Sequence, residues 1–119
     1  MDDEQLIHDW LVRTLKSRLS REYREIKDNL AGRENEFNGC YPDLILGNHG
    51  MVLAVVEVET EGSIGKEKAA QWKALSGTGT KLILMLPKKT VKRVTELLWE
   101  ESIADRVSIG TYDIAINMP

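Results

Sequence analysis

Two glutamates stand at the end of the most hydrophobic segment of the chain, MVLAVVEVET at positions 51–60. Because side chains alternate between the two faces of a β-strand, Glu57 and Glu59 would lie on the same face, ~7 Å apart along the strand. Two like charges at that separation repel each other by about 2 kcal/mol at an effective dielectric constant of about 20. The pair therefore calls for either a compensating cation or a solvated strand end.

A third carboxylate, Asp43, begins another apolar segment, and the turn residues GNHG at 47–50 separate the two segments. Two strands joined by so short a turn form a hairpin. If the register brings the faces of Asp43, Glu57 and Glu59 together, three carboxylates converge near one edge of the sheet. Carboxylate clusters hold Mg²⁺ or Mn²⁺, and a bound cation would offset the repulsion. On periodicity alone, a charged strand end in solvent explains the pattern as well.

The elements that would position these residues show alternating helical and strand periodicity. We predict helices at 3–20, 64–75 and 90–101, the last two capped by Ser63 and Thr90. The apolar stripe of the first helix contains Leu6, Ile7, Trp10, Leu11 and Leu15.

Strands are expected at 22–27, 41–46, 51–60 and 80–87, with one or two more within 106–116. Residues 28–39 are polar and typical of a loop. The segment 51–60 is apolar on both faces except at its end, so helices should cover both sides of the sheet. The order of elements predicts an α/β fold with a mixed central β-sheet flanked by helices.

Length and composition limit the class of protein. The 119 residues suit one domain, 1–119, and the single cysteine excludes an internal disulfide framework and fits a reducing compartment. The acidic N-terminal segment does not resemble a signal peptide, and no apolar run approaches the ~20 residues of a membrane span. We therefore expect a soluble, cytoplasmic protein with no membrane partner. The net charge of −3 provides no general attraction to nucleic acid, although a local basic patch remains compatible with it.

A motif resemblance adds to this interpretation. Pro42-Asp43, a hydrophobic strand and then Glu57-Val58-Glu59 resemble the PD-(D/E)xK motif of nucleases with the restriction endonuclease-like fold. The predicted elements are also similar to that family's αβββαβ core, here with a further C-terminal helix and strand. The resemblance implies that Asp43 and Glu57 bind Mg²⁺ or Mn²⁺ and that the substrate is nucleic acid, above all DNA. Glu59 replaces the family's usual lysine, as in the Glu-x-Glu form of active restriction enzymes, and would act as a third metal ligand or as a base that positions the attacking water.

A lysine could reach the site from the following helix. Lys68 shares the apolar stripe of that helix with Ile64, Trp72 and Leu75. In relatives of the resembling family the catalytic lysine sometimes lies on this helix, where Lys68 would stabilise charge on the phosphate, with Lys66 as the fallback. The alternative is that the Lys68 stem packs while its ammonium reaches solvent.

Other polar residues carry weaker signals. Gln71, at the edge of the same stripe, is similar to the glutamine on this helix in RecB-like nucleases, although surface polarity explains it equally. His8 and His49 show no ligand spacing, and we interpret both as incidental. Cys40 lacks the Cys-His pattern of a nucleophile and is expected to be a small buried side chain. Glu4 corresponds to an acid that often reaches the site in the resembling family, although the helix dipole alone favours an acid there.

A basic segment follows the fourth predicted strand. It contains the four cations that we expect to contact phosphates, Lys88, Lys89, Lys92 and Arg93. A solvated helix face is the ordinary explanation of such a run.

Together these features predict a metal-dependent nuclease that hydrolyses phosphodiester bonds. The alternative is a catalytically inactive nuclease-fold module that acts in binding or regulation. Repulsion and burial predict a raised pKa for at least one of Glu57 and Glu59. The segment 106–119, rich in β-forming residues, is expected either to contact a second copy in a two-fold dimer or to close the sheet of its own chain.

Overall fold

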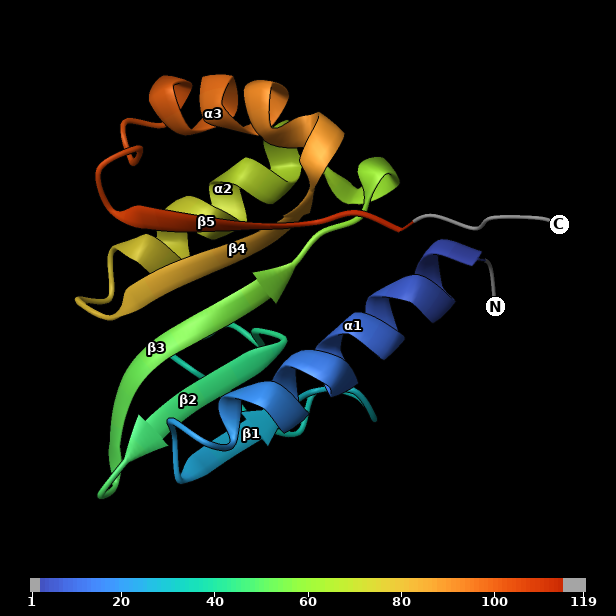
Figure 1. The fold of residues 1–119 in the computed structure, drawn as a ribbon. Helices are drawn as coiled ribbons and strands as arrows, with labels where there is room; N and C mark the ends of the chain where they lie inside the picture. Colours follow the sequence, from blue (N-terminus) through green and yellow to red (C-terminus); the bar gives the residue numbers. More distant parts are fainter. Residues whose placement is uncertain (1–2, 115–119) are drawn as a thin grey trace, which may run out of the picture.

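A mixed β-sheet lies between two layers of helices in the computed structural model, which describes residues 3–114 (Figure 1). The elements, in chain order, are α1 (Asp3–Leu19), β1 (Glu25–Asp28), β2 (Leu44–Asn48), β3 (Met51–Val58), the 3₁₀ helix η1 (Glu61–Ser63), α2 (Lys66–Ser76), β4 (Lys81–Pro87), the 3₁₀ helix η2 (Lys88–Thr90), α3 (Val91–Glu100) and β5 (Val107–Tyr112). The α/β class, the mixed sheet and the predicted order of helices and strands are confirmed.

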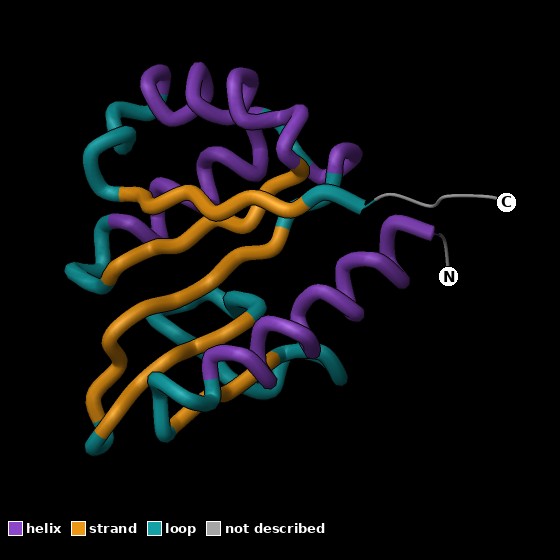
Figure 2. Tube along the Cα trace, in the orientation of Figure 1, coloured by secondary structure: helices purple, strands orange, loops and turns teal. Residues whose placement is uncertain are grey.

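Within residues 3–114 the sheet has the strand order β1-β2-β3-β4-β5 (Figure 2). Strands β1, β2 and β3 are antiparallel neighbours, whereas β3, β4 and β5 are parallel. The change of direction follows from the connections. A tight turn can join antiparallel strands, but a parallel pair requires a crossover, which α2 and α3 provide here.

The two faces of β3 pack against different helices. On one face, Val55 belongs to a core with side chains of α2 and α3, including Trp72 and Leu98. On the other face, Val56 and Val58 pack with Leu11 and other residues of α1. Burial on both faces accounts for the continuous apolar run that precedes Glu57, as is usual for a strand covered by helices on both sides.

The apolar stripe of α1 differs from the prediction. Leu11 and Val12 are buried, but Leu6 and Trp10 are 54% and 56% exposed. The face of α1 that contains Leu11 and Leu15 packs against the sheet. With α1 in this orientation, Leu6 points toward solvent. Periodicity indicated a helix correctly but misplaced part of its buried stripe.

Both predicted helix caps also need correction. Ser63 ends η1, and α2 begins three residues later with Gly65 at its N-cap position. Thr90 does occupy the N-cap position of α3, but its hydroxyl donates to the carbonyl oxygen of Pro87 and caps no amide of the helix. Each hydroxyl is drawn instead into the short 3₁₀ helix that precedes the longer helix.

A β-bulge sets the register of the hairpin that carries the candidate site. The turn has positive φ at His49 (54°) and Gly50 (76°), as a two-residue hairpin turn of type I′ requires. Asn48 pairs with Met51, but the register shifts by one residue between Leu46 and Gly47. Beyond the shift Leu44 pairs with Val56, so the next pair outward is Asp43 opposite Glu57.

Candidate active site

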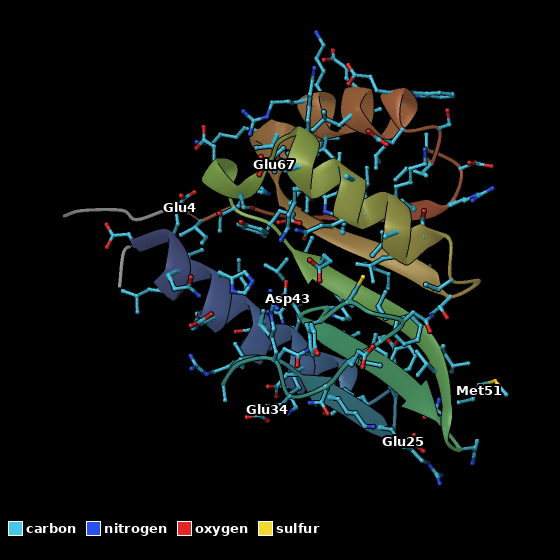
Figure 3. The ribbon with its side chains drawn as sticks, turned by 180° about the vertical axis from the view of Figure 1, so that it is seen from behind. Glu4, Glu25, Glu34, Asp43, Met51 and Glu67 are labelled. Atoms are coloured by element: carbon cyan, nitrogen blue, oxygen red, sulfur yellow. The ribbon has the colours of Figure 1, made fainter. Side chains whose placement is uncertain are left out.

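Asp43 and Glu57 meet at the end of the sheet that lies away from the hairpin turn (Figure 3, where Met51 marks the turn). The backbone amide of Asp43 donates to Oε1 of Glu57 at 3.0 Å, and the amide of Val58 donates to Oδ2 of Asp43 at 2.7 Å. Each carboxylate is thus held by the backbone of the neighbouring strand. The structure brings these two predicted residues together, and their predicted binding of a metal stays a prediction.

Glu59 lies on the same face of the sheet but is enclosed, with 1% of its surface exposed. Its Oε2 accepts a hydrogen bond from the indole Nε1 of Trp72 at 2.8 Å, and its Oε1 accepts one from the Ser63 hydroxyl at 2.9 Å. Both oxygens of Glu59 therefore have protein donors, unlike those of an open metal ligand.

Lys68 reaches from α2 to both glutamates. Its Nζ lies 3.7 Å from Oε2 of Glu57 and 3.7 Å from Oε1 of Glu59. The half-buried ammonium thus lies between the two glutamates whose repulsion the sequence suggests. Lys68 therefore supplies at least part of the positive charge that offsets this repulsion. Lys66, the alternative lysine, is exposed at the first position of α2.

His8 on α1 is a site residue that the sequence interpretation dismissed. Its Nε2 lies 3.0 Å from Oδ1 of Asp43, and its Nδ1 lies 3.0 Å from Oδ1 of Asp9. A signal was present in the sequence, because His8, Leu11, Val12 and Leu15 follow the i, i+3, i+4, i+7 spacing of one helix face. Assigning Leu6 and Trp10 to the buried stripe hid that signal.

The charges at the site depend strongly on burial. Burial raises the pKa of Glu57 to about 8, and the neighbouring charge of Asp43 adds to the effect. Burial also raises the pKa of Glu59, against the opposing effects of Lys68 and of the hydrogen bond from Trp72. The raised pKa expected for this pair is therefore found in both glutamates, with burial as the larger cause.

The two cations at the site respond to these carboxylates. The hydrogen bond to Asp43 raises the pKa of His8 to about 9, although burial acts in the opposite direction. Burial likewise lowers the pKa of Lys68, but the charges of Glu59 and Glu57 outweigh it and the net shift is upward. At neutral pH the cluster thus combines buried carboxyl groups, of which Glu57 is mostly protonated, with two positively charged side chains.

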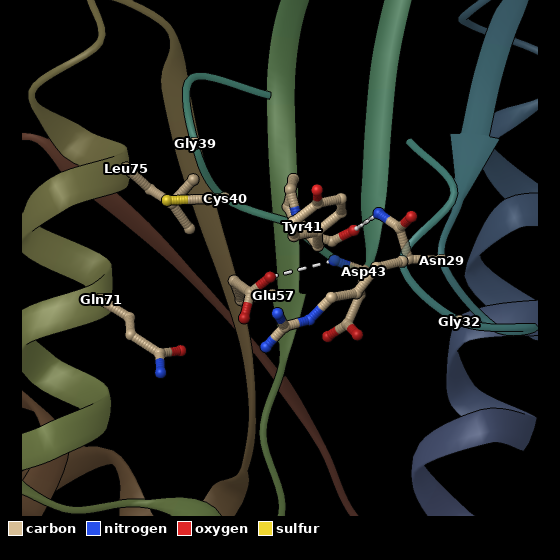
Figure 4. Close-up of a pocket in the computed structure, with 11 residues that line it drawn as sticks. Asn29, Gly32, Gly39, Cys40, Tyr41, Asp43, Glu57, Gln71 and Leu75 are labelled. Atoms are coloured by element: carbon tan, nitrogen blue, oxygen red, sulfur yellow. Dashed lines mark hydrogen bonds between the residues drawn. The ribbon is translucent and has the colours of Figure 1, made fainter. Parts of the chain in front are cut away.

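Two hollows flank the cluster. One, of about 440 Å³, lies between α2 and the loop before β2 and includes Asp43, Glu57 and Gln71 in its lining (Figure 4). The other, of about 310 Å³, lies between α1 and η1 and is lined in part by His8, Glu59 and Lys68. Asp43 and Glu57 are therefore reached from the first hollow, and Glu59 and Lys68 from the second.

The loop of residues 29–43 forms the outer wall of the larger hollow. The Asn29 amide nitrogen donates to the carbonyl oxygens of Asn35 (3.0 Å) and Pro42 (2.7 Å). The Asn29 oxygen accepts hydrogen bonds from the backbone amides of Glu34 (3.1 Å) and Asn35 (2.7 Å). A long connection braced in this way is a defined structural element. The sequence indicated only a polar loop here.

The remaining candidates have other partners or positions. Glu4 accepts a hydrogen bond from the backbone amide of Gly62 at 2.7 Å, which ties α1 to η1. Cys40 is half-buried and packs against the core beside α2 instead of being fully enclosed. His49 is exposed in the hairpin turn, where its role is conformational.

The basic segment is partly paired. Lys89 Nζ lies 2.9 Å from a carboxylate oxygen of Glu61, and the Arg93 guanidinium donates to the Glu61 carbonyl oxygen at 3.0 Å. These contacts hold the basic segment close to η1, which follows Glu59 in the chain. Lys88 and Lys92 are exposed at the same end of α3.

The arrangement differs from a closed metal centre. Among residues 3–114, no three His, Cys, Asp or Glu side chains are grouped so that they could hold a metal ion as they stand. Of the three carboxylates that were expected to converge, Asp43 and Glu57 meet, whereas Glu59 is turned toward Trp72. Two carboxylates still match Mg²⁺, which usually keeps several waters and takes its other ligands from substrate phosphates.

Comparisons with known proteins supply no family. The chain matches no protein-family model, and no curated protein matches it significantly. Within residues 3–114, no helix combines the length and the apolar character needed to cross a membrane.

Proposed function

We propose that this protein is a metal-dependent nuclease of the PD-(D/E)xK type, with a single restriction endonuclease-like domain spanning residues 1–119. One observation carries the proposal: Asp43 and Glu57 are joined across β2 and β3, and Lys68 reaches Glu57 from α2. An acidic pair beside a cation suits phosphodiester hydrolysis, in which one side binds a divalent cation and the other meets negative charge on the phosphate.

Asp43 and Glu57 would hold Mg²⁺ or Mn²⁺. Such an ion would polarise a phosphate and acidify a water molecule. The chemistry of the donors fits, because burial raises the free energy of ionised Glu57 and a cation would lower it again. His8 would keep the Asp43 carboxylate oriented through its 3.0 Å contact.

Lys68 would stabilise negative charge on the phosphate from the opposite side of Glu57. To meet the phosphate, its ammonium must be held in position, and the contacts with Glu57 and Glu59 would hold it there. The hydrogen bonds to Glu59 favour this anchoring role over the predicted role as a third metal ligand or base.

The substrate in this proposal is DNA, and the basic segment would contact its backbone. Lys88 and Lys92 are exposed. Lys89 and Arg93 already contact Glu61, so they would bind a phosphate either in addition to Glu61 or after breaking these contacts. Phosphate contacts of this kind increase affinity without selecting sequence.

Metal titration and cleavage assays test the proposal together. We expect Mn²⁺ to bind the wild-type protein in calorimetry and both Asp43→Asn and Glu57→Gln to weaken that binding by roughly tenfold or more. Cleavage of single-stranded, duplex or branched DNA should depend on Mg²⁺ or Mn²⁺ and disappear in both variants. Glu67→Gln, at an exposed position of α2, is the matched control and should behave as wild type.

Activity that survives Asp43→Asn and Glu57→Gln would remove the proposed site. The alternative function, a catalytically inactive module for binding or regulation, has one specific observation in its favour: both oxygens of Glu59 already have donors. Absence of Mg²⁺ and Mn²⁺ binding at millimolar concentration would favour that module.

A further inference from the structure

The larger hollow next to Asp43 and Glu57 has the chemistry of a site for a flat, polar ring. Its volume of about 440 Å³ lies within the range of about 300–1,000 Å³ typical of small-ligand sites. Apolar lining comes from Cys40 and Leu75, and aromatic lining from Tyr41. In the view of Figure 4, Tyr41 and Gln71 lie on either side of Glu57.

Tyr41 presents an aromatic surface only two positions before Asp43. Its side chain is 40% exposed, and the guanidinium carbon of Arg33 lies 5.4 Å from the ring centre. This geometry is a cation–π contact, and it places two planar side chains together at the wall of the hollow. Planar side chains of these two types are those on which unpaired bases stack in nucleic-acid complexes.

Polar groups in the hollow have capacity for a ligand. Arg33 forms no ion pair with any other residue of the range 3–114, and the Gln71 amide has no hydrogen-bond partner in the same range. An amide can donate to and accept from the edge of a base, and a guanidinium can bind a phosphate. The hollow thus combines stacking, edge recognition and positive charge.

The wall of the hollow is built before any ligand arrives. The side chain of Asn29 makes four hydrogen bonds to the loop, and one of them reaches the carbonyl oxygen of Pro42, next to Tyr41. Pro42 is itself buried. Preorganisation of this kind lowers the entropic cost of binding.

From these observations we propose that the hollow binds an unpaired nucleobase of single-stranded DNA, stacked against Tyr41, next to the phosphate held at Asp43 and Glu57. This inference rests on the proposed function, to which it adds the substrate class. A base in a duplex can enter such a hollow only after it leaves its stack and its partner. The protein therefore prefers single strands, frayed ends or branched junctions to intact duplex.

Binding can be separated from cleavage with Ca²⁺ in place of Mg²⁺. The probe is a short single-stranded DNA oligonucleotide containing 2-aminopurine, whose fluorescence is quenched when the base stacks. We expect wild type to quench it and to bind it more tightly than a blunt duplex of the same length. Tyr41→Leu should weaken binding about 5- to 100-fold and abolish quenching, whereas Tyr41→Phe should retain both. Trp99→Leu, an exposed aromatic position on α3, is the control and should match wild type.

A second variant acts through the loop. Asn29→Ala should weaken oligonucleotide binding more than Mn²⁺ binding, because three of the four hydrogen bonds of Asn29 go to Glu34 and Asn35 in the wall. The fourth goes to the carbonyl oxygen of Pro42, whose peptide also carries the Asp43 amide that contacts Glu57. Equal affinity of wild type and Tyr41→Leu for the single strand, no binding of the single strand, or a preference for duplex would each overturn the inference.

The inference and the proposed function can fail separately. Metal-dependent cleavage that does not respond to Tyr41→Leu would reject the base-binding hollow and leave the nuclease intact. Tyr41-dependent binding of the single strand without binding of Mg²⁺ or Mn²⁺ would reject the nuclease and leave a single-strand binding module.

Discussion

Glu57 near the end of β3 and Glu59 just beyond that end stand two positions apart but have different surroundings. Glu57 contacts the Asp43 amide and lines a hollow, whereas Glu59 is enclosed by Trp72 and Ser63. A carboxylate with two protein donors is suited to hold a neighbour, and one with fewer donors can still bind a ligand. At the scale of single residues, the proposed function therefore assigns metal binding to Glu57 and anchoring of Lys68 to Glu59.

The first prediction concerns the pH dependence contributed by Glu57. Its pKa is raised from 4.5 to about 8 in the folded protein, so between these values the folded state binds more protons than the unfolded state. The free energy of unfolding should therefore fall as pH rises through this window. Glu57→Gln removes the effect and should be more stable than wild type by about 1–3 kcal/mol at pH 8, with little difference near pH 4.

Urea denaturation at several pH values measures the Glu57 contribution. Glu67→Gln, exposed on α2, controls for the general effect of losing a carboxylate. A Glu57→Gln variant that is less stable than wild type at pH 8 would contradict the prediction and mean that Lys68 fully compensates the ionised carboxylate.

The second prediction concerns the buried contact between Trp72 and Glu59. Trp72→Phe leaves Oε2 of Glu59 without its 2.8 Å donor inside the core, and should destabilise the protein by about 2–4 kcal/mol at pH 7. Because a smaller ring also leaves space, the coupling is best isolated by a double-mutant cycle with Glu59→Gln. We expect a coupling energy of at least about 1 kcal/mol, and additive effects would count against the hydrogen bond. Trp99→Phe on the exposed face of α3 serves as control.

At the scale of elements, the bulge of the β2–β3 hairpin decides where the site forms. The turn alone would continue the register of Asn48 with Met51, which places Asp43 opposite Val56 and on the face away from Glu57. One extra residue in β3 moves Asp43 opposite Glu57. The site thus depends on an irregularity several residues away from it.

The third prediction tests this dependence through Gly47. A Cβ at this position would lie 2.5 Å from the backbone oxygen of Met51, so Gly47→Ala should disturb the bulge and destabilise the protein by about 1–3 kcal/mol. Gly65→Ala is the matched control, because its backbone is extended and the space around it is open. Beyond the stability loss, the contact of the Asp43 amide with Glu57 should weaken.

The amide proton of Asp43, followed by NMR, reports the register directly. We expect its chemical shift and its protection from hydrogen exchange to change in Gly47→Ala and to keep their wild-type values in Gly65→Ala. An unchanged Asp43 amide in a destabilised Gly47→Ala protein would show that the register does not depend on this glycine.

At the scale of the whole molecule, the two edges of the sheet differ. Edge strand β1 carries three charged residues in its four positions, whereas edge strand β5, with the sequence VSIGTY, carries none. Charges on an edge strand oppose pairing with another chain, so β5 is the more open edge. Residues 107–112 pair with β4 and thus close the sheet of their own chain, which was one of the two expectations for the segment 106–119. Positions 115–119 of that segment lie outside the described residues.

The fourth prediction is a two-fold dimer formed through β5. Light scattering should give a mass near twice the 13.5 kDa of one chain. Ile109→Lys, at an exposed position of β5, should shift the mass to one chain without loss of the circular dichroism of the fold. Lys27→Ala on β1 is the control and should stay dimeric. A wild-type monomer at tens of micromolar would refute the dimer and direct attention to substrates that need one active site.

Patterns within the amino-acid sequence were enough to predict the order and the type of the main helices and strands. Hydrophobic periodicity is a local property, and the uninterrupted apolar run of residues 51–56 is enough to predict a central strand covered by helices. That the strands of Asp43 and Glu57 are neighbours could be expected from the short turn, and the position of Lys68 from the helical stripe it shares with Trp72. These inferences need only the parity of a strand and the turn of a helix.

Packing between the elements fixes which polar atoms meet. The Asp43–Glu57 register depends on a bulge, and the hydrogen-bond partner of His8 lies 35 positions away in the chain. The orientation of Glu59 toward Trp72, and the loop that places Tyr41 and Arg33 beside the carboxylates, likewise arise from packing between elements. Such contacts follow from how whole helices and strands fit together in three dimensions, and no periodicity within a short window of sequence encodes that fit.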